Sequence, residues 1–310
     1  MLKNQRKVMM NMIRRVYRHL DSLPSGRAGE QLTHGCLILE GGGWKGLYTL
    51  GVLDCLMQND INFSAVAGCS AGALSAIGYV AGQIGWGARI DLTYRHDPNY
   101  CGPGAMLRDG GITGFTYLFR DIIKDMPLDK KRLADSSRRL AVSAVNLLTG
   151  SVEYFEKGSC NLSKAVQASA TVPFISRPVM IGGVPYLDGG CAEKIPFPWA
   201  AQSGESKVVV VRTRELSYRR KPGLTKLADV MYRRYPNLLK SMKKANENFN
   251  ADVEMLERKS AAGEIFLIAP SETVTVSRFD GDMDKLGALY WLGWRDMNAR
   301  LDALRAYLNS

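Results

Sequence analysis

Two short apolar runs near the start of the chain each end at a glycine and are each followed by a segment with helical spacing. The run Cys36–Leu39 leads into Gly41-Gly42-Gly43, and Gly46–Met57 then places its apolar residues at the spacing of a buried helix. The run Phe63–Ala67 is followed by small apolar residues over Ala71–Ala81. A strand–helix–strand–helix order with tight connections predicts parallel strands covered by helices. The sequence therefore predicts an α/β fold with a mostly parallel sheet.

The rest of the chain continues this alternation within what we expect to be one domain. Further strands are expected over Leu140–Val145, Ser151–Phe155, Val179–Leu187, Lys207–Arg212 and Ile265–Ile268. Further helices are expected over Leu162–Ser169, Leu224–Arg258 and Asp284–Leu308, and an irregular surface loop over Tyr100–Gly114. No repeat or Pro/Ser-rich linker divides the chain. We therefore expect a basic N-terminal extension over residues 1–34 and one domain over 35–310, helical from about 224 to 310.

The composition predicts a cytoplasmic protein. Lys and Arg interrupt the N-terminal residues too often for the apolar core of a signal peptide, and no stretch approaches the roughly 18 apolar residues of a membrane span. The six cysteines form no CxxC pair and lie in apolar or glycine-rich runs, which predicts reduced thiols.

Positive charge is concentrated in two segments. The chain has a net charge of +11, and residues 1–20 carry Lys and Arg without any acid. Residues 212–244 hold many more cations, against only Glu215 and Asp229. Such segments favour an anionic partner, either a membrane or a nucleic acid. Because aromatic residues are few there and no nucleic-acid motif accompanies them, we expect no nucleic acid.

Two interpretations of the second basic segment stay open. Apolar residues recur at mostly helical spacing beside its cations: Leu224, Leu227, Val230, Met231, Leu238, Leu239 and Met242. This helix could lie on the inner face of an anionic membrane with its cations toward the head groups. Its apolar face could equally pack on the core of the protein and leave a solvated basic face.

A candidate nucleophile stands between the second strand and its helix. Gly68-Cys69-Ser70-Ala71-Gly72 matches the pattern G-x-S-x-G, in which a sharp turn exposes the serine oxygen. Residues two before and two after the serine must be very small, or the turn would collide with neighbouring strands. The helix that follows directs its N-terminal N–H groups at the site, which favours developing negative charge. A serine in an ordinary glycine-rich turn is the alternative.

A glycine-rich loop follows the first strand. Three glycines in Glu40-Gly41-Gly42-Gly43-Trp44-Lys45-Gly46 allow the backbone to approach a ligand and to direct N–H groups at an anion. A phosphate cradle is one interpretation, but the loop lacks the signatures of a P-loop or a dinucleotide fold. An oxyanion hole beside Ser70 is the interpretation that we favour.

The candidate base is an aspartate. All three histidines precede Asp188, which excludes the order Ser…Asp…His with Asp188 as the acid. Of the three, only His96 follows Ser70, and a lone His before Asp97-Pro98 is typical of a surface loop. Asp188-Gly189-Gly190 follows an expected strand, so its carboxylate can be presented on a tight turn. An ordinary turn aspartate is the alternative for this pattern.

Together the three motifs resemble the patatin-like phospholipase family. The order is G-G-G-x-K-G over residues 41–46, G-x-S-x-G over 68–72 and D-G-G over 188–190. The block Ala168–Phe174 is also similar to one that precedes the aspartate in that family. The resemblance is good over residues 35–215, and Pro270–Gly293 looks like the tail of the small bacterial branch.

The resemblance implies a three-layer α/β/α sandwich and a Ser–Asp dyad without histidine, with no metal and no cofactor. Ser70 would attack an ester carbonyl, and Asp188 would accept its proton and later activate water. The N–H groups near Gly42, Gly43 and Trp44 would hold the oxyanion. The substrates implied are phospholipids, lysophospholipids or other acyl esters. The alternative function is a non-catalytic lipid- or protein-binding module on the same fold.

Overall fold

The centre of the molecule is an eight-stranded sheet. The computed structural model describes residues 16–221, 223 and 226–310. Within them the strand order is β10-β9-β2-β3-β5-β8-β7, and β6 also pairs with β5. The strands are β2 (Thr33–Leu39), β3 (Phe63–Cys69), β5 (Arg139–Asn146), β6 (Val152–Glu156), β7 (Val179–Ile181), β8 (Val184–Asp188), β9 (Val208–Val211) and β10 (Phe266–Ile268). Pairing is parallel from β10 to β5, whereas β6, β7 and β8 add antiparallel pairs.

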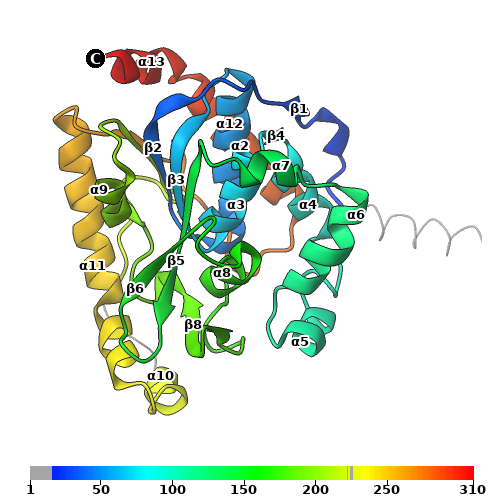
Figure 1. Ribbon diagram of the computed structural model, residues 1–310, viewed down its shortest axis with the longest axis vertical. Coiled ribbons are helices and arrows are strands. Elements are labelled where there is room, and N and C mark those ends of the chain that lie inside the picture. Colours follow the sequence, from blue (N-terminus) through cyan, green and yellow to red (C-terminus); the bar gives the residue numbers. More distant parts are fainter. Residues whose placement is uncertain (1–15, 222, 224–225) are drawn as a thin grey trace, which may run out of the picture.

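The helices lie on both faces of this sheet (Figure 1). They are α2 (Gly46–Gln58), α3 (Ala71–Val80), α4 (Trp86–Tyr94), α5 (Pro103–Asp109), α6 (Ile123–Asp125), α7 (Lys130–Ala134), α8 (Leu162–Ser169), α9 (Ala200–Ser203), α10 (Lys226–Met231), α11 (Pro236–Ala261), α12 (Met283–Asn298) and α13 (Leu301–Asn309). Short 3-10 helices are η1 (Leu20–Ser22), η2 (Gly43–Lys45), η4 (Gly189–Cys191) and η5 (Phe197–Trp199), and η3 (Tyr117–Ile122) is a π-helix.

Alternation along the strands explains the layers. In β2, Leu37 and Leu39 pack in the core that α2 and α12 cover, while Cys36 and Ile38 pack in the core beneath α11. Successive side chains of a strand point to opposite faces, so a strand that is apolar at every position is buried on both. The predicted three-layer α/β/α sandwich is confirmed. Its sheet is mixed, because the antiparallel strands follow β5.

The C-terminal part is built into this sandwich. β10 extends the sheet beside β9, with Leu267 opposite Val210. α12 crosses α2 so closely that a Cβ atom on Gly51 would lie 2.0 Å from the Tyr290 carbonyl oxygen. No side chain can occupy that position unless the helices separate.

Four expected elements differ in the structure. The expected helix Asp284–Leu308 is divided into α12, which ends at Asn298, and α13, which begins at Leu301. The expected strand Val179–Leu187 is a hairpin of β7 and β8, because Gly182 and Gly183 both take positive φ and turn the chain. The expected helix Leu224–Arg258 is wrong at one point: it breaks between α10 and α11, where Pro236 opens the second helix. The expected loop Tyr100–Gly114 contains α5.

The basic N-terminal residues 1–15 lie outside the described residues. From residue 16 onward the chain packs on the domain: Tyr17 is buried, and its N–H donates to the Leu92 carbonyl at 3.0 Å. The short strand β1 (Gly26–Arg27) pairs with β4 (Gln83–Ile84). In the described part of the chain, no helix is both long enough and apolar enough to cross a bilayer.

Candidate active site

Ser70 lies on a strained turn between β3 and α3. Its backbone has φ 55° and ψ −118°, a conformation that costs a non-glycine residue free energy and that is typical of functional sites. Gly68 and Gly72 make the turn possible. A Cβ atom on Gly68 would lie 2.5 Å from the Gly72 carbonyl, and one on Gly72 would lie 2.5 Å from the Leu39 oxygen. The Ser70 side chain is therefore raised above the end of the sheet, as the G-x-S-x-G pattern predicts.

Asp188 lies directly beside Ser70. The distance from Ser70 Oγ to Asp188 Oδ2 is 2.6 Å, and the second oxygen, Oδ1, accepts the Gly190 N–H at 2.8 Å. Asp188 ends β8, where it is opposite Ala144 of β5, and β5 is the neighbour of β3. The strand order β3-β5-β8 thus brings together two residues that are 118 positions apart.

A third residue, Ser169, orients the turn. Its Oγ lies 2.9 Å from the Ser70 backbone nitrogen and accepts that N–H. Ser169 is the last residue of α8 and belongs to the block Ala168–Phe174. The block is visible in the sequence, but no local pattern predicts this role of the serine.

Burial and the polar neighbours of Asp188 have opposite effects on the pKa of its carboxyl group. Burial raises its pKa above the ordinary value for aspartate. The hydrogen bonds from Ser70 and Gly190 act in the opposite direction, as do the charges of Lys194 and Arg278. A buried carboxylate with a raised pKa is a stronger proton acceptor than one in water, which suits a general base.

The glycine loop presents free N–H groups beside Ser70. The Gly41 N–H donates to Lys194 O at 2.9 Å, and the Lys45 N–H lies 3.3 Å from Gly42 O. In contrast, the N–H groups of Gly42, Gly43 and Trp44 donate to no acceptor among residues 16–221, 223 and 226–310. The positive φ of Gly43, 57°, turns the loop, and both it and Trp44 line the cavity that contains Ser70. An anion at Ser70 could be bound by these groups.

Glu40 ties the loop to the neighbouring strand. Its Oε2 accepts the Thr213 N–H at 2.7 Å and lies 3.8 Å from Arg212 Nε. Glu40 and Arg212 are both fully buried. Because a buried carboxylate with these partners has little freedom, Glu40 fixes where the glycine loop begins. Glu40 stands at the start of the glycine loop in the sequence, but its partners Arg212 and Thr213 are distant in the chain, so this role was not predicted.

Two cavities meet at Ser70. The first is apolar and contains the side chains of Trp44, Leu74, Ile77, Trp86, Ile90 and Leu118. The second contains Asp188 and four cations: Lys45, Lys194, Arg220 and Arg278. Lys45 belongs to the predicted glycine loop. Arg220 lies in the basic segment 212–244 and Arg278 in the stretch Pro270–Gly293, but neither pattern predicts a place beside Ser70, and Lys194 lies outside both segments.

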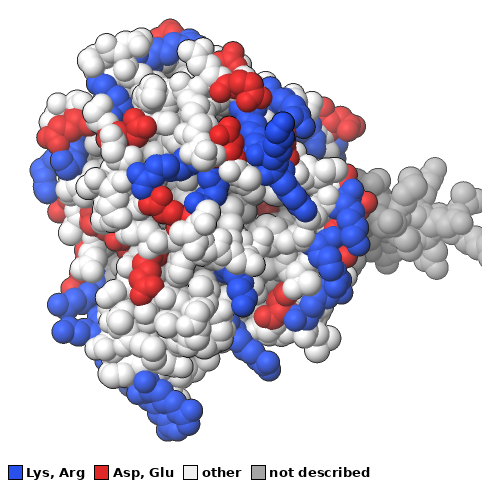
Figure 2. Space-filling view, viewed as in Figure 1, with Lys and Arg blue, Asp and Glu red and all other residues white. Residues whose placement is uncertain are grey.

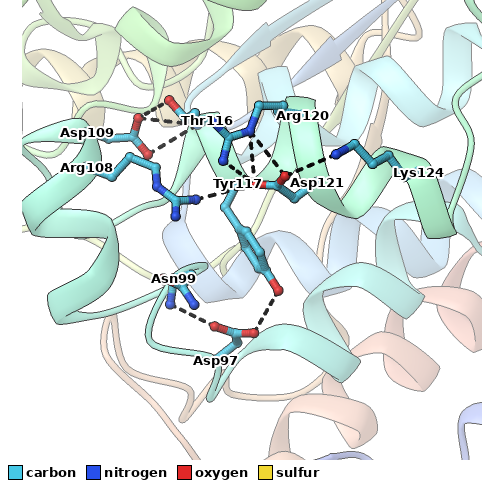
Figure 3. A network of polar contacts seen from close by, with 9 residues as sticks. All are labelled: Asp97, Asn99, Arg108, Asp109, Thr116, Tyr117, Arg120, Asp121 and Lys124. Atoms are coloured by element: carbon cyan, nitrogen blue, oxygen red, sulfur yellow. Dashed lines mark hydrogen bonds and ion pairs between the residues drawn. The ribbon is translucent and has the colours of Figure 1, made fainter.

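A polar network holds the wall of the apolar cavity (Figure 3). Tyr117, on η3, donates to Asp97 at 3.0 Å, and Thr116 donates to Asp109 at the end of α5. Arg108 pairs with Asp121 at 3.4 Å, which joins α5 to η3 a second time. Leu118 projects from the same π-helix into the cavity. These contacts hold α5, which lies within the expected irregular loop Tyr100–Gly114, against η3.

No histidine in the described part of the chain lines either cavity. His96 Nε2 is instead 2.8 Å from the Gly281 carbonyl oxygen, in contact with the loop before α12. In that loop, Asp282 caps α12 by accepting the N–H groups of Asp284 and Lys285. Within residues 16–221, 223 and 226–310, no group of three or more His, Cys, Asp or Glu is arranged to hold a metal ion.

Two curated proteins are similar to part of this chain. An uncharacterised Escherichia coli protein, YjjU, is 31% identical over 182 residues, which cover 57% of this chain and 51% of the relative. An uncharacterised NTE family protein of Mycobacterium tuberculosis is 25% identical over 182 residues, or 56% of this chain and 48% of the relative. The match therefore spans about half the length of these curated relatives.

A solved structure and two family models also match this chain. The crystal structure of VipD from Legionella pneumophila is similar with a TM-score of 0.50 at 15% identity, over 94% of this chain and 71% of that one. A family model described as a domain of unknown function (DUF6363) matches residues 235–309. The model of the patatin-like phospholipase family matches residues 37–201, which include Ser70 and Asp188. Since this match spans more than half of the chain, the protein belongs to the patatin-like phospholipase family.

Proposed function

We propose that the protein is a serine acyl-ester hydrolase with Ser70 as nucleophile and Asp188 as base. The observation that carries this proposal is the distance of 2.6 Å between Ser70 Oγ and Asp188 Oδ2, on a strained turn that opens into an apolar cavity. A nucleophile needs a base within hydrogen-bond reach, and here no histidine competes for that place.

The reaction would proceed in two stages. Ser70 Oγ attacks the ester carbonyl carbon while Asp188 accepts the hydroxyl proton. The N–H groups of Gly42, Gly43 and Trp44 stabilise the oxyanion of the tetrahedral intermediate. The intermediate collapses to an acyl-enzyme as the alcohol leaves with the proton from Asp188. Asp188 then deprotonates a water molecule, which attacks the acyl-enzyme. The carboxylic acid is released, and Ser70 Oγ takes its proton back from Asp188.

The first test separates this enzyme from a binding module on the same fold. A fluorophosphonate probe reacts with an activated serine, forming an O–P bond and releasing fluoride. We expect one phosphonyl group per chain, located on the peptide that contains Ser70 by mass spectrometry. Ser70→Ala protein should remain unmodified. Wild-type protein that stays unlabelled would favour the non-catalytic module.

The structure divides the basic segment 212–244 into different environments. Arg212 is fully buried beside Glu40, so it cannot contact a partner. α11 packs Leu238 and Met242 into the core, as the core-packing interpretation requires. In contrast, α10 leaves apolar side chains exposed to solvent: the exposed fractions of Leu227, Val230 and Met231 are 53%, 68% and 47%.

We propose that α10 and the adjoining cations contact an anionic membrane. Arg233, Arg234, Lys243 and Lys244 are exposed, and Lys243 Nζ lies 2.8 Å from Asp229 of α10. Cations are spread over the face seen in Figure 2, including its lower edge, where α10 lies. Met242, which precedes Lys243 on α11, lines the cavity that contains Asp188, so this surface lies close to that cavity. Cations near an anionic bilayer contribute about 1 kcal/mol each, and exposed apolar side chains add to that.

Vesicle co-sedimentation tests this surface. We expect binding to anionic vesicles at low salt, weakened by high salt, and little binding to neutral vesicles, because salt screens the attraction. Replacing all four cations by glutamate should weaken binding at least about tenfold. The matched control reverses four exposed cations elsewhere: Lys131, Arg258, Arg295 and Arg305. Equal weakening by both sets, or equal binding to both vesicle types, would contradict the proposed surface.

A further inference from the structure

The C-terminal segment of residues 235–309, which matches the domain of unknown function, shares the sheet and the core of the rest of the chain. Its strand β10 pairs with β9, and its helix α12 crosses α2. At that crossing the Tyr290 hydroxyl donates to the buried carboxylate of Asp54 at 2.7 Å. Because the two parts have one core between them, the C-terminal segment can hold residues at a fixed place beside the site.

One loop of this segment, residues 274–282, reaches the site around Ser70. The described residues that line both cavities are Gly43, Ser70, Val172 and Arg278, and of these only Arg278 belongs to the C-terminal segment. A Cβ atom on Gly43 would lie 3.7 Å from Arg278 Cγ, which is an ordinary contact distance. The 274–282 loop therefore packs against the glycine loop where the two cavities meet.

The core holds the start of the 274–282 loop but not its tip. Val274 and Val276 are buried, and the Val274 N–H donates to Glu215 Oε2 at 3.1 Å. In contrast, Arg278 and Phe279 are exposed, although both line the apolar cavity. A loop tip whose side chains are exposed keeps one position only if other groups bind its backbone.

Arg95, which follows α4, binds the backbone of this tip. Its Nε donates to the Asp280 carbonyl at 2.7 Å, and its Nη2 donates to the Phe279 carbonyl at 3.0 Å. The same guanidinium lies 4.7 Å from the centroid of the Trp44 ring, in the glycine loop. A planar guanidinium suits this place, because its edge donates hydrogen bonds while its face packs on an aromatic ring. One side chain thus joins the two loops that meet beside the nucleophile.

The position of Arg278 matters for the base. Burial raises the pKa of Asp188, and the charges of Lys194 and Arg278 act in the opposite direction. A nearby cation favours the ionised carboxylate, which is the form that can accept the proton of Ser70. The other titratable groups of this region are Cys69, Cys191, Glu193, Lys45 and Arg220.

We infer that the C-terminal segment completes the active site and that Arg95 is the positioning residue that fixes its 274–282 loop against the glycine loop. This inference rests on the proposed function, because it concerns the same site. Arg95 itself is not among the described residues that line either cavity. It acts through the Trp44 ring and through the backbone that carries Arg278.

Hydrogen exchange, followed by mass spectrometry, tests the positioning without any turnover. In the 274–282 loop the N–H groups of Ser277 and Asp282 donate to the Asp280 side chain, and Arg95 binds the carbonyl of that same residue. Arg95→Gln should therefore raise the exchange rate of a peptide over 274–282 at least about threefold, because local opening becomes more frequent. Unchanged exchange would overturn the inference, whether or not the protein is a hydrolase.

Arg258→Gln is the matched control for this variant. It makes the same substitution at an exposed arginine of α11, within the C-terminal segment but outside both cavities. The exchange of the 274–282 peptide and the rate of ester hydrolysis should both stay at the wild-type level. Equal effects of the two substitutions would overturn the role of Arg95.

Hydrolysis of a short p-nitrophenyl ester tests the consequence for the reaction. Arg95→Gln should lower kcat/KM at least about tenfold, mainly through kcat, since the glycine loop and the base both act in the transition state. Arg95→Lys keeps a donor for the same carbonyls and should retain more activity than Arg95→Gln. Wild-type kinetics in Arg95→Gln would overturn the inference. Wild-type protein that hydrolyses no ester would instead contradict the proposed function, and the exchange experiment would still decide the role of Arg95.

The acid limb of the pH profile gives a readout that a loss of packing alone would not move. Arg278→Gln removes a cation that favours ionised Asp188, so the acid limb of kcat/KM should move to higher pH by at least about 0.3 pH unit. Arg95→Gln should move it in the same direction, because the displaced loop carries Arg278 away. In the double variant the two shifts should not add, since both act through Arg278. Additive shifts, or no shift in either single variant, would overturn the inference.

Discussion

Replacing Ser70 by alanine should lower the hydrolysis of a short p-nitrophenyl ester at least about a thousandfold, since removal of a nucleophile costs several orders of magnitude. Among the described residues that line the two cavities, Ser70 is the serine at hydrogen-bond distance from a carboxylate. Alanine keeps the Cβ atom of Ser70 and removes only its hydroxyl group, so the packing around the turn and its strained backbone stay the same. The fold should therefore remain intact by circular dichroism.

Ser137→Ala is the matched control for this variant. Ser137 is exposed and lies outside both cavities, so its loss should leave the rate unchanged. If Ser70→Ala kept more than about a tenth of the wild-type rate, another group would be the nucleophile, because hydrolysis without one is far slower.

Replacing Asp188 by asparagine should be nearly as damaging, with a loss of about 10²- to 10⁴-fold, the contribution of a general base. Asparagine keeps the shape of the side chain and can still contact Ser70, but it cannot accept the serine proton. The rate on the same ester measures the loss. His96→Ala is the control, because His96 contacts the loop before α12 and lines neither cavity.

The pH profile gives the same prediction a second readout. Burial raises the pKa of Asp188, and the base must be ionised to act. Activity should therefore be present above the folded-state pKa of Asp188 and be lost as the pH falls through it. The ionised carboxylate is also disfavoured by burial, so Asp188→Asn should not lower the melting temperature at neutral pH. If Asp188→Asn were as active as the wild type and His96→Ala were inactive, the site would use a histidine as its base.

The glycine-rich turns could be predicted because they depend on local chain geometry. Gly68 and Gly72 leave room where a side chain would collide, and this requirement is visible as G-x-S-x-G. The helix α8 was expected with the same bounds, Leu162–Ser169, since its caps and apolar spacing are local features. The short continuous apolar runs likewise predicted β2 and β3, whose central residues are buried on both faces of the sheet.

Expectations failed where a single residue interrupts a longer pattern. Pro236 divides the expected helix into α10 and α11, and the separation decides which apolar residues are buried. Leu238 is fully buried on α11, whereas Val230 on α10 is exposed, although both fit one helical spacing. Periodicity reports that a face is apolar, but it does not report whether another element covers it.

By itself, the sequence determined the local conformations: the turn that raises Ser70, the glycine loop beside it and the strands that cross the core. Only the tertiary structure decided which distant groups meet there. The strand order β3-β5-β8 brings Asp188 to Ser70, and separate loops bring Arg220 and Arg278 to the same cavity. The physical reason is that turn geometry depends on neighbouring residues, whereas the convergence of side chains depends on how strands pair and on the paths of loops between them.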